Sequence, residues 1–110
     1  MLSLFSNQCC VTSTTETETL EAAHIKDWSV SKNDDPTNGL CLRSDIHRLF
    51  GKGLLDIDDK FCVLISPQVK DVQYKLLHGK KIHLPKAQLD WPKKEFLLWR
   101  LNERGNEIPK

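Results

Sequence analysis

The feature that most constrains the fold is the stretch from residue 20 to residue 53, which predicts a strand, a polar loop, a second strand and a short helix. Leu20–Ile25 is compact and too short to be stable as a helix, so we interpret it as a strand that ends at His24. Lys26–Thr37 is polar, and Asn33-Asp34-Asp35-Pro36 within it favours turns. This order of elements folds back on itself, which lets side chains from its separate parts reach one point.

The second half of this stretch predicts a turn, a strand and the start of a helix. Asn38-Gly39 is a residue pair typical of hairpin turns, and Leu40-Cys41-Leu42 follows as a short strand. Ser44 is expected to cap the helix, with Asp45 in the first turn, where the helix dipole favours negative charge.

The predicted helix is only about two turns long. Apolar residues recur at helical spacing along it, and two glycines are expected to stop it. The apolar positions are Ile46, Leu49 and Phe50, and the glycines are Gly51 and Gly53.

Beyond residue 53 the sequence predicts a second hairpin and two further helices. The expected elements are strands at Leu54–Asp58 and Phe61–Ser66, a helix over Val69–Gly79, an extended piece at Ile82–Pro85, and a helix over Lys93–Glu103 with Pro92 at its first position. A chain of 110 residues is enough for one small domain and not for two. We therefore expect a single α+β domain over residues 1–110, with a core at about 9–65 and a C-terminal extension at 66–110.

The formal net charge of +1 hides an asymmetry between the two parts of the chain. Residues 1–69 hold 6 Lys/Arg against 10 Asp/Glu, whereas residues 70–110 hold 10 against 5. A basic C-terminal part is compatible with a polyanionic partner, although a solvated basic face is equally common. The same two interpretations stay open for the candidate DNA-binding residues, which are Lys80, Lys81, Lys93 and Lys94.

The absence of an apolar segment and the spacing of the cysteines narrow the class of protein further. No apolar run approaches the roughly 20 residues needed to cross a bilayer, and the start lacks the basic and apolar regions of a secretory signal. We therefore expect a cytoplasmic protein with no membrane contact, in which disulfides are not favoured. A zinc-cysteine site usually has two pairs of closely spaced cysteines. Here Cys9 and Cys10 are adjacent, whereas Cys41 and Cys62 stand alone, so a zinc site stays open only as a minor alternative.

Three residues in this fold pattern suit phosphodiester hydrolysis assisted by a metal ion. His24 ends the first strand, Asn38 lies in the turn, and His47 lies early in the helix. Such a reaction needs a group that takes a proton from water, which a neutral imidazole can do near neutral pH. It also needs a cation that polarises the phosphate and stabilises the leaving oxygen.

The same segments resemble the HNH endonuclease family of the ββα-metal superfamily. The likeness rests on Leu-Glu-Ala-Ala-His-Ile at 20–25, Asn-Gly-Leu at 38–40, Asp-Ile-His-Arg-Leu-Phe at 45–50 and Gly-Leu-Leu at 53–55. The spacing of 14 positions from His24 to Asn38 and 9 from Asn38 to His47 also matches. The resemblance covers roughly residues 9–65 and is strongest to a restriction-endonuclease-like branch with L-E-A-A-H-I, N-G-L and L-H-R-L-F motifs.

The resemblance implies a ββα-metal core and a role for each matching residue. His24 would be the general base, Asn38 would pin the loop and help to orient His24, and His47 would bind one divalent metal ion (Mg²⁺, Mn²⁺, Ni²⁺ or Zn²⁺). Gly39 would permit the turn after Asn38, and Phe50 would pack the helix onto the hairpin. His47 would also need a partner for its second ring nitrogen, which the sequence does not identify.

The chain departs from the family pattern at three positions. Ala23 stands where many HNH proteins have a second metal ligand, and Glu21, on the same strand face, could approach the metal instead. Gly51 replaces an Asp, and the family Gly near Ser13 is missing.

The implied function is a DNA endonuclease of a restriction or mobile-element defence type. It would act as a homodimer or in association with a larger restriction or defence protein. The alternative is a non-catalytic nucleic-acid-binding or scaffold domain that retains the HNH fold. We interpret Trp28, Trp91, Trp99, His78 and His83 as structural residues.

Overall fold

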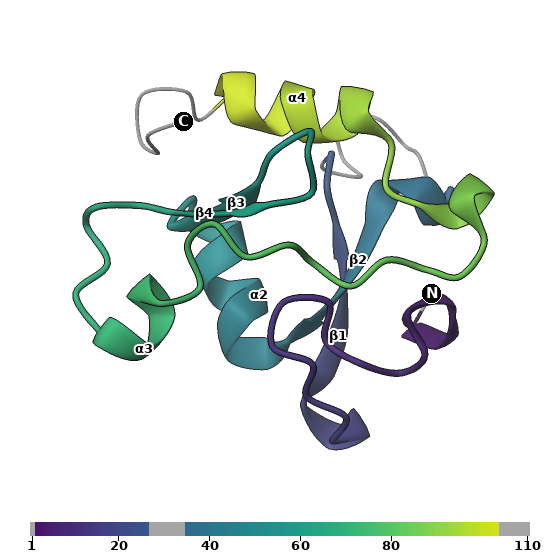
Figure 1. Ribbon diagram of the computed structural model, residues 1–110, viewed down its shortest axis with the longest axis horizontal. Coiled ribbons are helices and arrows are strands. Elements are labelled where there is room, and N and C mark those ends of the chain that lie inside the picture. The colour runs from purple at the N-terminus through teal and green to yellow at the C-terminus, as the bar shows by residue number, and fades with distance from the viewer. Residues whose placement is uncertain (1, 27–34, 104–110) are drawn as a thin grey trace.

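The computed structural model describes residues 2–26 and 35–103, and all statements on the fold concern these ranges (Figure 1). Its strands are β1 (Leu20–His24), β2 (Gly39–Arg43), β3 (Leu55–Ile57) and β4 (Val63–Ile65). Its α-helices are α2 (Ser44–Gly51), α3 (Val72–Lys75) and α4 (Lys94–Glu103), and its 3₁₀ turns are η1 (Leu2–Phe5), η2 (Thr17–Thr19), η3 (Pro36–Asn38) and η4 (Gln88–Asp90).

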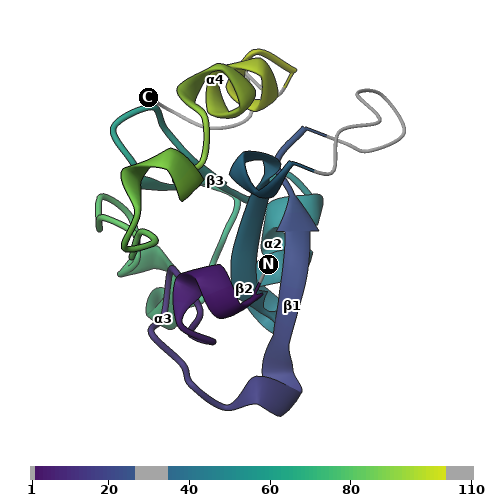
Figure 2. The ribbon, with the colours of Figure 1, turned by 90° about the vertical axis from the view of Figure 1, so that its right-hand side faces the viewer.

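The first hairpin and the helix after it form a ββα unit. β1 and β2 are antiparallel, in a register that runs from Leu20 opposite Arg43 to His24 opposite Gly39. α2 contacts both strands and lies behind the hairpin in Figure 2, while η1 contacts the same strands from the front. β2 is therefore buried along its length except at Arg43, which is half-buried. The predicted α+β class and the order strand, strand, helix are confirmed.

The second hairpin, β3 with β4, joins the first through an irregular series of backbone hydrogen bonds. Ile82 donates its amide to the carbonyl of Phe61, and His83 donates to the carbonyl of Cys10. Cys10 in turn donates to the carbonyl of Cys41 in β2 at 2.9 Å. The N-terminal segment thus lies between the two hairpins and satisfies backbone groups that would otherwise form open strand edges.

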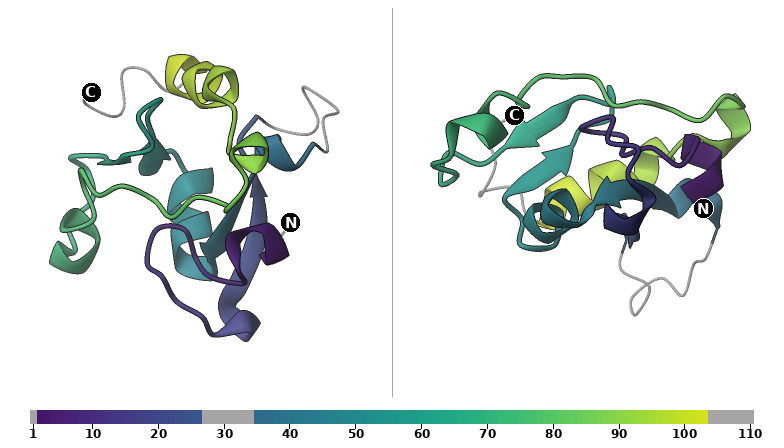
Figure 3. Two further views of the ribbon diagram at one scale, coloured as in Figure 1. Left: turned by 45° about the vertical axis from the view of Figure 1, so that its right-hand side comes forward. Right: turned by 90° about the horizontal axis from the view of Figure 1, so that it is seen from below.

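One hydrophobic cluster extends from Phe5 near the N-terminus to Leu97 in α4. α4 crosses one end of both hairpins (Figure 3) and contacts β3. Phe50 of α2 is 1% exposed within this cluster, so it packs the helix onto the hairpin as expected. None of the helices in the described ranges is long and apolar enough to cross a membrane.

The helix predicted over Val69–Gly79 was wrong beyond a single turn. α3 covers only Val72–Lys75, where Asp71 caps the first turn by accepting a hydrogen bond from the Gln73 amide. Val72 and Leu76 are 63% and 68% exposed, whereas Val69 is buried and Leu77 packs against the core, so only part of the expected apolar stripe meets the core. The chain instead turns at Gly79, whose φ of 85° lies in the left-handed region, and rejoins β4.

The expected hairpin turn at Asn38-Gly39 was also wrong. Gly39 has φ −133°, an extended conformation, and is the first residue of β2. The reversal takes the longer connection between β1 and η3, much of which falls at 27–34, outside the described residues. Gly39 is therefore not needed for a positive φ, and the two-residue pattern misled because a long loop closes this hairpin.

The helix ends differ slightly from expectation. α2 begins at Ser44 itself, and the residue before it, Arg43, offers no side-chain cap, although Asp45 does lie in the first turn. Gly51 is the last residue of the helix, and the chain turns at Gly53, which has φ 76° and donates to the carbonyl of Phe50. In the same way, Pro92 precedes α4 and is not in its first turn.

Candidate metal and catalytic site

The centre of the candidate site is a contact between α2 and β1. His47 of α2 donates a hydrogen bond from Nδ1 to Oε1 of Glu21 in β1 over 2.7 Å. The two residues line a shallow surface cavity of about 480 Å³, together with Ser44, Asp45 and Arg48. The His47 side chain is 36% exposed and that of Glu21 is 50% exposed, so a small ion or a phosphate oxygen can reach both.

Strand geometry explains why Glu21 lies at this helix. Side chains two residues apart share a face of a strand, so Glu21 points to the same side of β1 as Ala23, which is 1% exposed. α2 packs against β1, and His47 in its first half reaches the carboxylate. The partner that the sequence left unidentified for His47 is thus Glu21.

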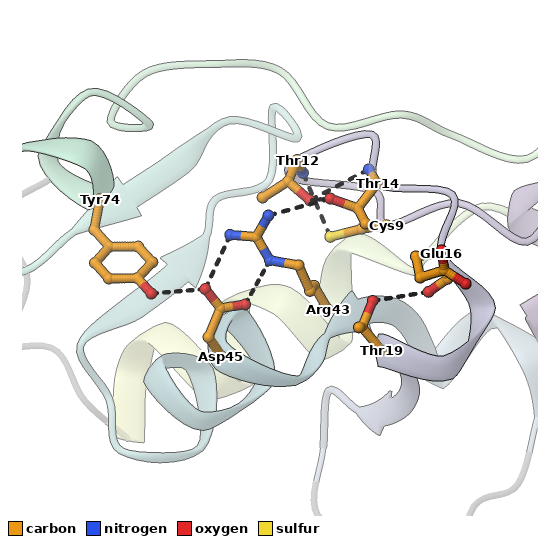
Figure 4. A network of polar contacts seen from close by, with 8 residues as sticks. All are labelled: Cys9, Thr12, Thr14, Glu16, Thr19, Arg43, Asp45 and Tyr74. Atoms are coloured by element: carbon orange, nitrogen blue, oxygen red, sulfur yellow. Dashed lines mark hydrogen bonds and ion pairs between the residues drawn. The ribbon is translucent and has the colours of Figure 1, made fainter.

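A second carboxylate beside the cavity is already engaged (Figure 4). Asp45 accepts two hydrogen bonds from the Arg43 guanidinium, at 2.6 Å from Nε and 2.9 Å from Nη2, and a third of 2.6 Å from the Tyr74 hydroxyl. These partners, Arg43 first, lower the pKa of Asp45 to about 2. The Arg43 guanidinium also reaches Thr14, which connects the N-terminal loop to the site.

Asn38 holds the chain directly after His24. Its Oδ1 accepts the amide of Lys26 at 2.8 Å, and its Nδ2 donates to the Lys26 carbonyl at 3.0 Å. Its backbone carbonyl accepts the amide of Ile25 at 2.9 Å. Asn38 is fully buried, so these bonds also satisfy polar groups that would otherwise be costly to bury. The pinning of the loop matches expectation, and the orientation of His24 stays a prediction.

The structure does not bring all three predicted residues into one cavity. His24 is half-buried at the end of β1, opposite Gly39, and does not line the cavity beside His47. Three positions separate it from Glu21, so strand alternation directs the two side chains to opposite faces of β1. His47 and Glu21 therefore form one part of the site, while His24 and Asn38 form another at the strand end.

The donor atoms at the cavity fit a divalent metal only as a sparse site. An imidazole nitrogen and a carboxylate oxygen are ligands that Zn²⁺, Ni²⁺ and Mn²⁺ accept. Within residues 2–26 and 35–103, no group of three or more His, Cys, Asp or Glu side chains could hold an ion. His47 would hold the metal, and water and substrate oxygens would complete its coordination.

The four candidate lysines lie away from this cavity. Lys80, Lys81, Lys93 and Lys94 are all exposed, and none lines it. Lys93 lies over the ring of Phe96 at 5.8 Å, and Lys94 lies over the ring of Phe61 at 5.9 Å. Their position neither requires nor opposes contact with a polyanion.

Arg100 is a central residue that the sequence did not single out. It is 3% exposed, and it donates to the carbonyls of Ile25 and Phe50 at 2.9 and 2.6 Å. Its guanidinium also stacks on the Phe50 ring at 3.7 Å and lies beside the buried carboxylate of Asp56 at 3.5 Å. One charge of the basic C-terminal part is therefore structural, and it joins α4 to the end of β1 that carries His24.

Three of the cysteines and Trp91 have packing roles. Cys9, Cys10 and Cys41 are buried free thiols, and burial, with Cys9 and Cys41 adding, raises the pKa of Cys10 well above its usual range. Trp91 donates to the Pro85 carbonyl and meets Phe61 edge to face, while Trp28 lies outside the described residues. Ser13, near which the resemblance implied a Gly, has φ 66°, in the left-handed region that favours glycine.

Comparison with known proteins relates this ββα unit to one family. Residues 9–58 match the HNH endonuclease family model, and the match spans the N-terminal loop, β1, β2, α2 and β3. We call this matched segment the HNH unit. The HNH unit holds His24, Asn38, His47 and Glu21, and the C-terminal residues from 59 onward lie outside the match. No curated protein matches the chain.

Proposed function

We propose that this protein is a metal-dependent endonuclease that hydrolyses DNA phosphodiester bonds. The family match points to nuclease activity in general. The observation that carries the finer proposal is the pairing of His47 with Glu21, which leaves the second ring nitrogen of His47 available in an open cavity of the HNH unit.

The chain's own residues would divide the work between two places. His24 at the end of β1 would take the proton from the attacking water, because a neutral imidazole is a base near neutral pH. Asn38 would keep the backbone after His24 in place through its bonds to Lys26. His47 would hold a divalent metal ion, which supplies charge that stabilises the phosphate and the leaving oxygen.

The division between the two places sets a condition on substrate binding. The water that His24 activates must attack the same phosphorus whose oxygens the metal ion at His47 would hold. The proposal therefore requires the scissile phosphate to be bound at the end of β1, within reach of both histidines.

Cleavage of supercoiled plasmid tests this function. The full chain is incubated with plasmid and Mg²⁺, Mn²⁺, Ni²⁺ or Zn²⁺ in turn, with and without chelator. We expect nicked or linear products that require one of these ions and vanish with the chelator. His47→Ala should lose the cleavage and its ion dependence together, with a far-ultraviolet circular dichroism spectrum like that of wild type. Cleavage by His47→Ala at the wild-type rate would remove His47 from the metal site.

A second candidate function, a scaffold domain without turnover, draws on the sparse ligand set among the described residues. Such a domain would bind DNA in a mobility-shift assay without any ion and leave every plasmid intact. The same plasmid experiment therefore separates the two functions. We further propose that the chain acts as a homodimer or with a larger restriction or defence protein, and light scattering tests the dimer.

A further inference from the structure

We propose that Glu21 is the positioning residue of the site, which fixes the protonation pattern and ring orientation of His47. This inference rests on the proposed function for its catalytic meaning, because His47 is there the metal-holding residue. Its structural content stands by itself: in the metal-free protein the neutral His47 ring carries its hydrogen on Nδ1 and presents a bare Nε2 to the cavity.

The polarity of the contact follows from the chemistry of the two groups. An ionised carboxylate can only accept hydrogen bonds, so the 2.7 Å contact requires the hydrogen to be on Nδ1 of His47. A neutral imidazole with hydrogen on Nδ1 has its lone pair on Nε2, the atom that can bind a cation. A carboxylate on the far nitrogen of a ligating histidine also raises the basicity of the ligand.

The surroundings explain why Glu21 has this role and not Asp45. Both carboxylates line the cavity. Asp45 is engaged by Arg43 and Tyr74, and the guanidinium largely neutralises its charge. Glu21 carries the cavity's other carboxylate and makes its contact with His47.

His78 is an internal reference, because its Nδ1 accepts a hydrogen bond whereas Nδ1 of His47 donates one. The Ile65 amide donates to Nδ1 of His78 at 2.9 Å, so Nδ1 of His78 is an acceptor and its hydrogen must be on Nε2. His47 and His78 are thus expected to show opposite tautomers in one spectrum. A general effect of solvent or of pH cannot produce such a difference.

Long-range ¹H–¹⁵N correlation spectra of the ¹⁵N-histidine-labelled, metal-free chain test the proposal at pH about 8.5, where free imidazole is neutral. The His47 signals are assigned from their absence in His47→Asn. We expect the Nδ1–H form for His47 and the Nε2–H form for His78 in wild type. Glu21→Ala should shift His47 toward the Nε2–H form, which predominates in free imidazole side chains, and leave His78 unchanged. A wild-type His47 in the Nε2–H form would overturn the proposal.

Two matched variants separate positioning from other roles of Glu21. Glu21→Gln keeps an acceptor oxygen for Nδ1 without the charge, so it should retain the wild-type tautomer. Glu18→Ala removes a comparable exposed carboxylate from η2 and should leave both histidine signals in place. A His47 shift in Glu18→Ala as large as that in Glu21→Ala would contradict a specific contact.

Metal titration supplies the second readout. Calorimetry with Ni²⁺ or Zn²⁺ should give about 10- to 100-fold weaker binding for Glu21→Ala than for wild type, and Glu21→Gln should lie nearer to wild type. Equal losses in Glu21→Gln and Glu21→Ala would make Glu21 a direct ligand and overturn the positioning role. A wild-type chain that shows the expected tautomers but binds no metal would refute the proposed function and leave the positioning of the ring supported.

Discussion

Asn38 holds the backbone of Lys26 with both ends of its side-chain amide, as acceptor of the Lys26 amide and donor to the Lys26 carbonyl. These two bonds join the chain that leaves β1 to the chain that enters β2. They lie directly after His24. Asn38 is therefore a structural residue, which connects the two strands of the first hairpin at one end, as well as a candidate site residue.

These two hydrogen bonds predict that removal of the Asn38 side chain lowers the stability of the protein. Asn38→Ala should lower the free energy of unfolding by about 2 kcal/mol, because it removes two hydrogen bonds made by a buried side chain and leaves the Lys26 amide and carbonyl without these partners. Asn38→Asp keeps the acceptor but cannot donate, so its loss should also be large. Urea denaturation followed by circular dichroism measures both. Asn102→Ala, at an exposed position of α4, is the control and should stay within roughly 0.5 kcal/mol of wild type.

His24→Ala should reduce plasmid cleavage by about 10²–10⁴-fold, the usual loss on removal of a general base. The fold and DNA binding should be nearly unchanged, because the side chain is only half-buried. Cleavage rates and a mobility-shift assay measure the two effects separately. His83→Ala, which changes an exposed histidine outside the cavity, should cleave like wild type. Turnover by His24→Ala close to that of wild type would assign the base to another group.

The buried pair of Arg100 and Asp56 should be far more sensitive than any surface charge. Arg100→Met should cost about 3–5 kcal/mol of stability, because it removes two buried hydrogen bonds to carbonyls and the cation beside the buried Asp56 carboxylate. Arg100→Met combined with Asp56→Asn should recover part of that loss, since the second change removes the buried charge. Arg48→Met, an exposed arginine of α2, should change stability little. A double variant no more stable than Arg100→Met would show that the carbonyl contacts of Arg100 dominate.

Asp45 should make the stability of the protein depend on pH in the acid range. Its folded-state pKa of about 2 lies below its ordinary value, mainly because of Arg43, so its contribution is present above pH about 4. That contribution should disappear as pH falls from about 4 to 2, when the carboxyl becomes protonated in the folded state. Asp45→Asn should be less stable than wild type at pH 7, by roughly 1 kcal/mol or less because the pair is partly exposed. Urea denaturation at pH 7 and at pH 2 should show this difference narrowing on acidification.

The basic C-terminal part can be tested through the salt dependence of DNA binding. If these lysines contact phosphates, Lys80→Glu with Lys81→Glu, or Lys93→Glu with Lys94→Glu, should lower the slope of log affinity against log salt by about 0.9 per lost contact. The acidic part of the chain provides a matched double variant, Lys52→Glu with Lys60→Glu. Equal slopes for all three double variants and wild type would identify the four lysines as a solvated face.

Local patterns were enough to predict most of the ββα unit. The strand at Leu20–His24, the strand after Asn38 and the helix through Phe50 were found because segment length, turn residues, helical spacing and a first-turn acid act within a few residues. The same logic failed at Val69–Gly79, where the apolar spacing is helical but only Val69 and Leu77 meet the core, while Val72 and Leu76 are exposed. It failed at Asn38-Gly39 because the turn chemistry of two residues was overridden by a loop whose closure depends on Lys26.

The sequence by itself determined the candidate residues, since the order and spacing of His24, Asn38 and His47 are properties of the chain and match a family. Only the tertiary structure decided how these residues are arranged and which other residues contact the site. Glu21 meets His47 across 26 positions, Tyr74 meets Asp45 across 29, and Arg100 meets Ile25 across 75. Contacts over such separations arise when a packed core brings distant segments together, and no local propensity encodes them. For the same reason, the placement of His24 and the His47 cavity on different faces of β1 could be assigned only from the packing of α2 against one face of the strand.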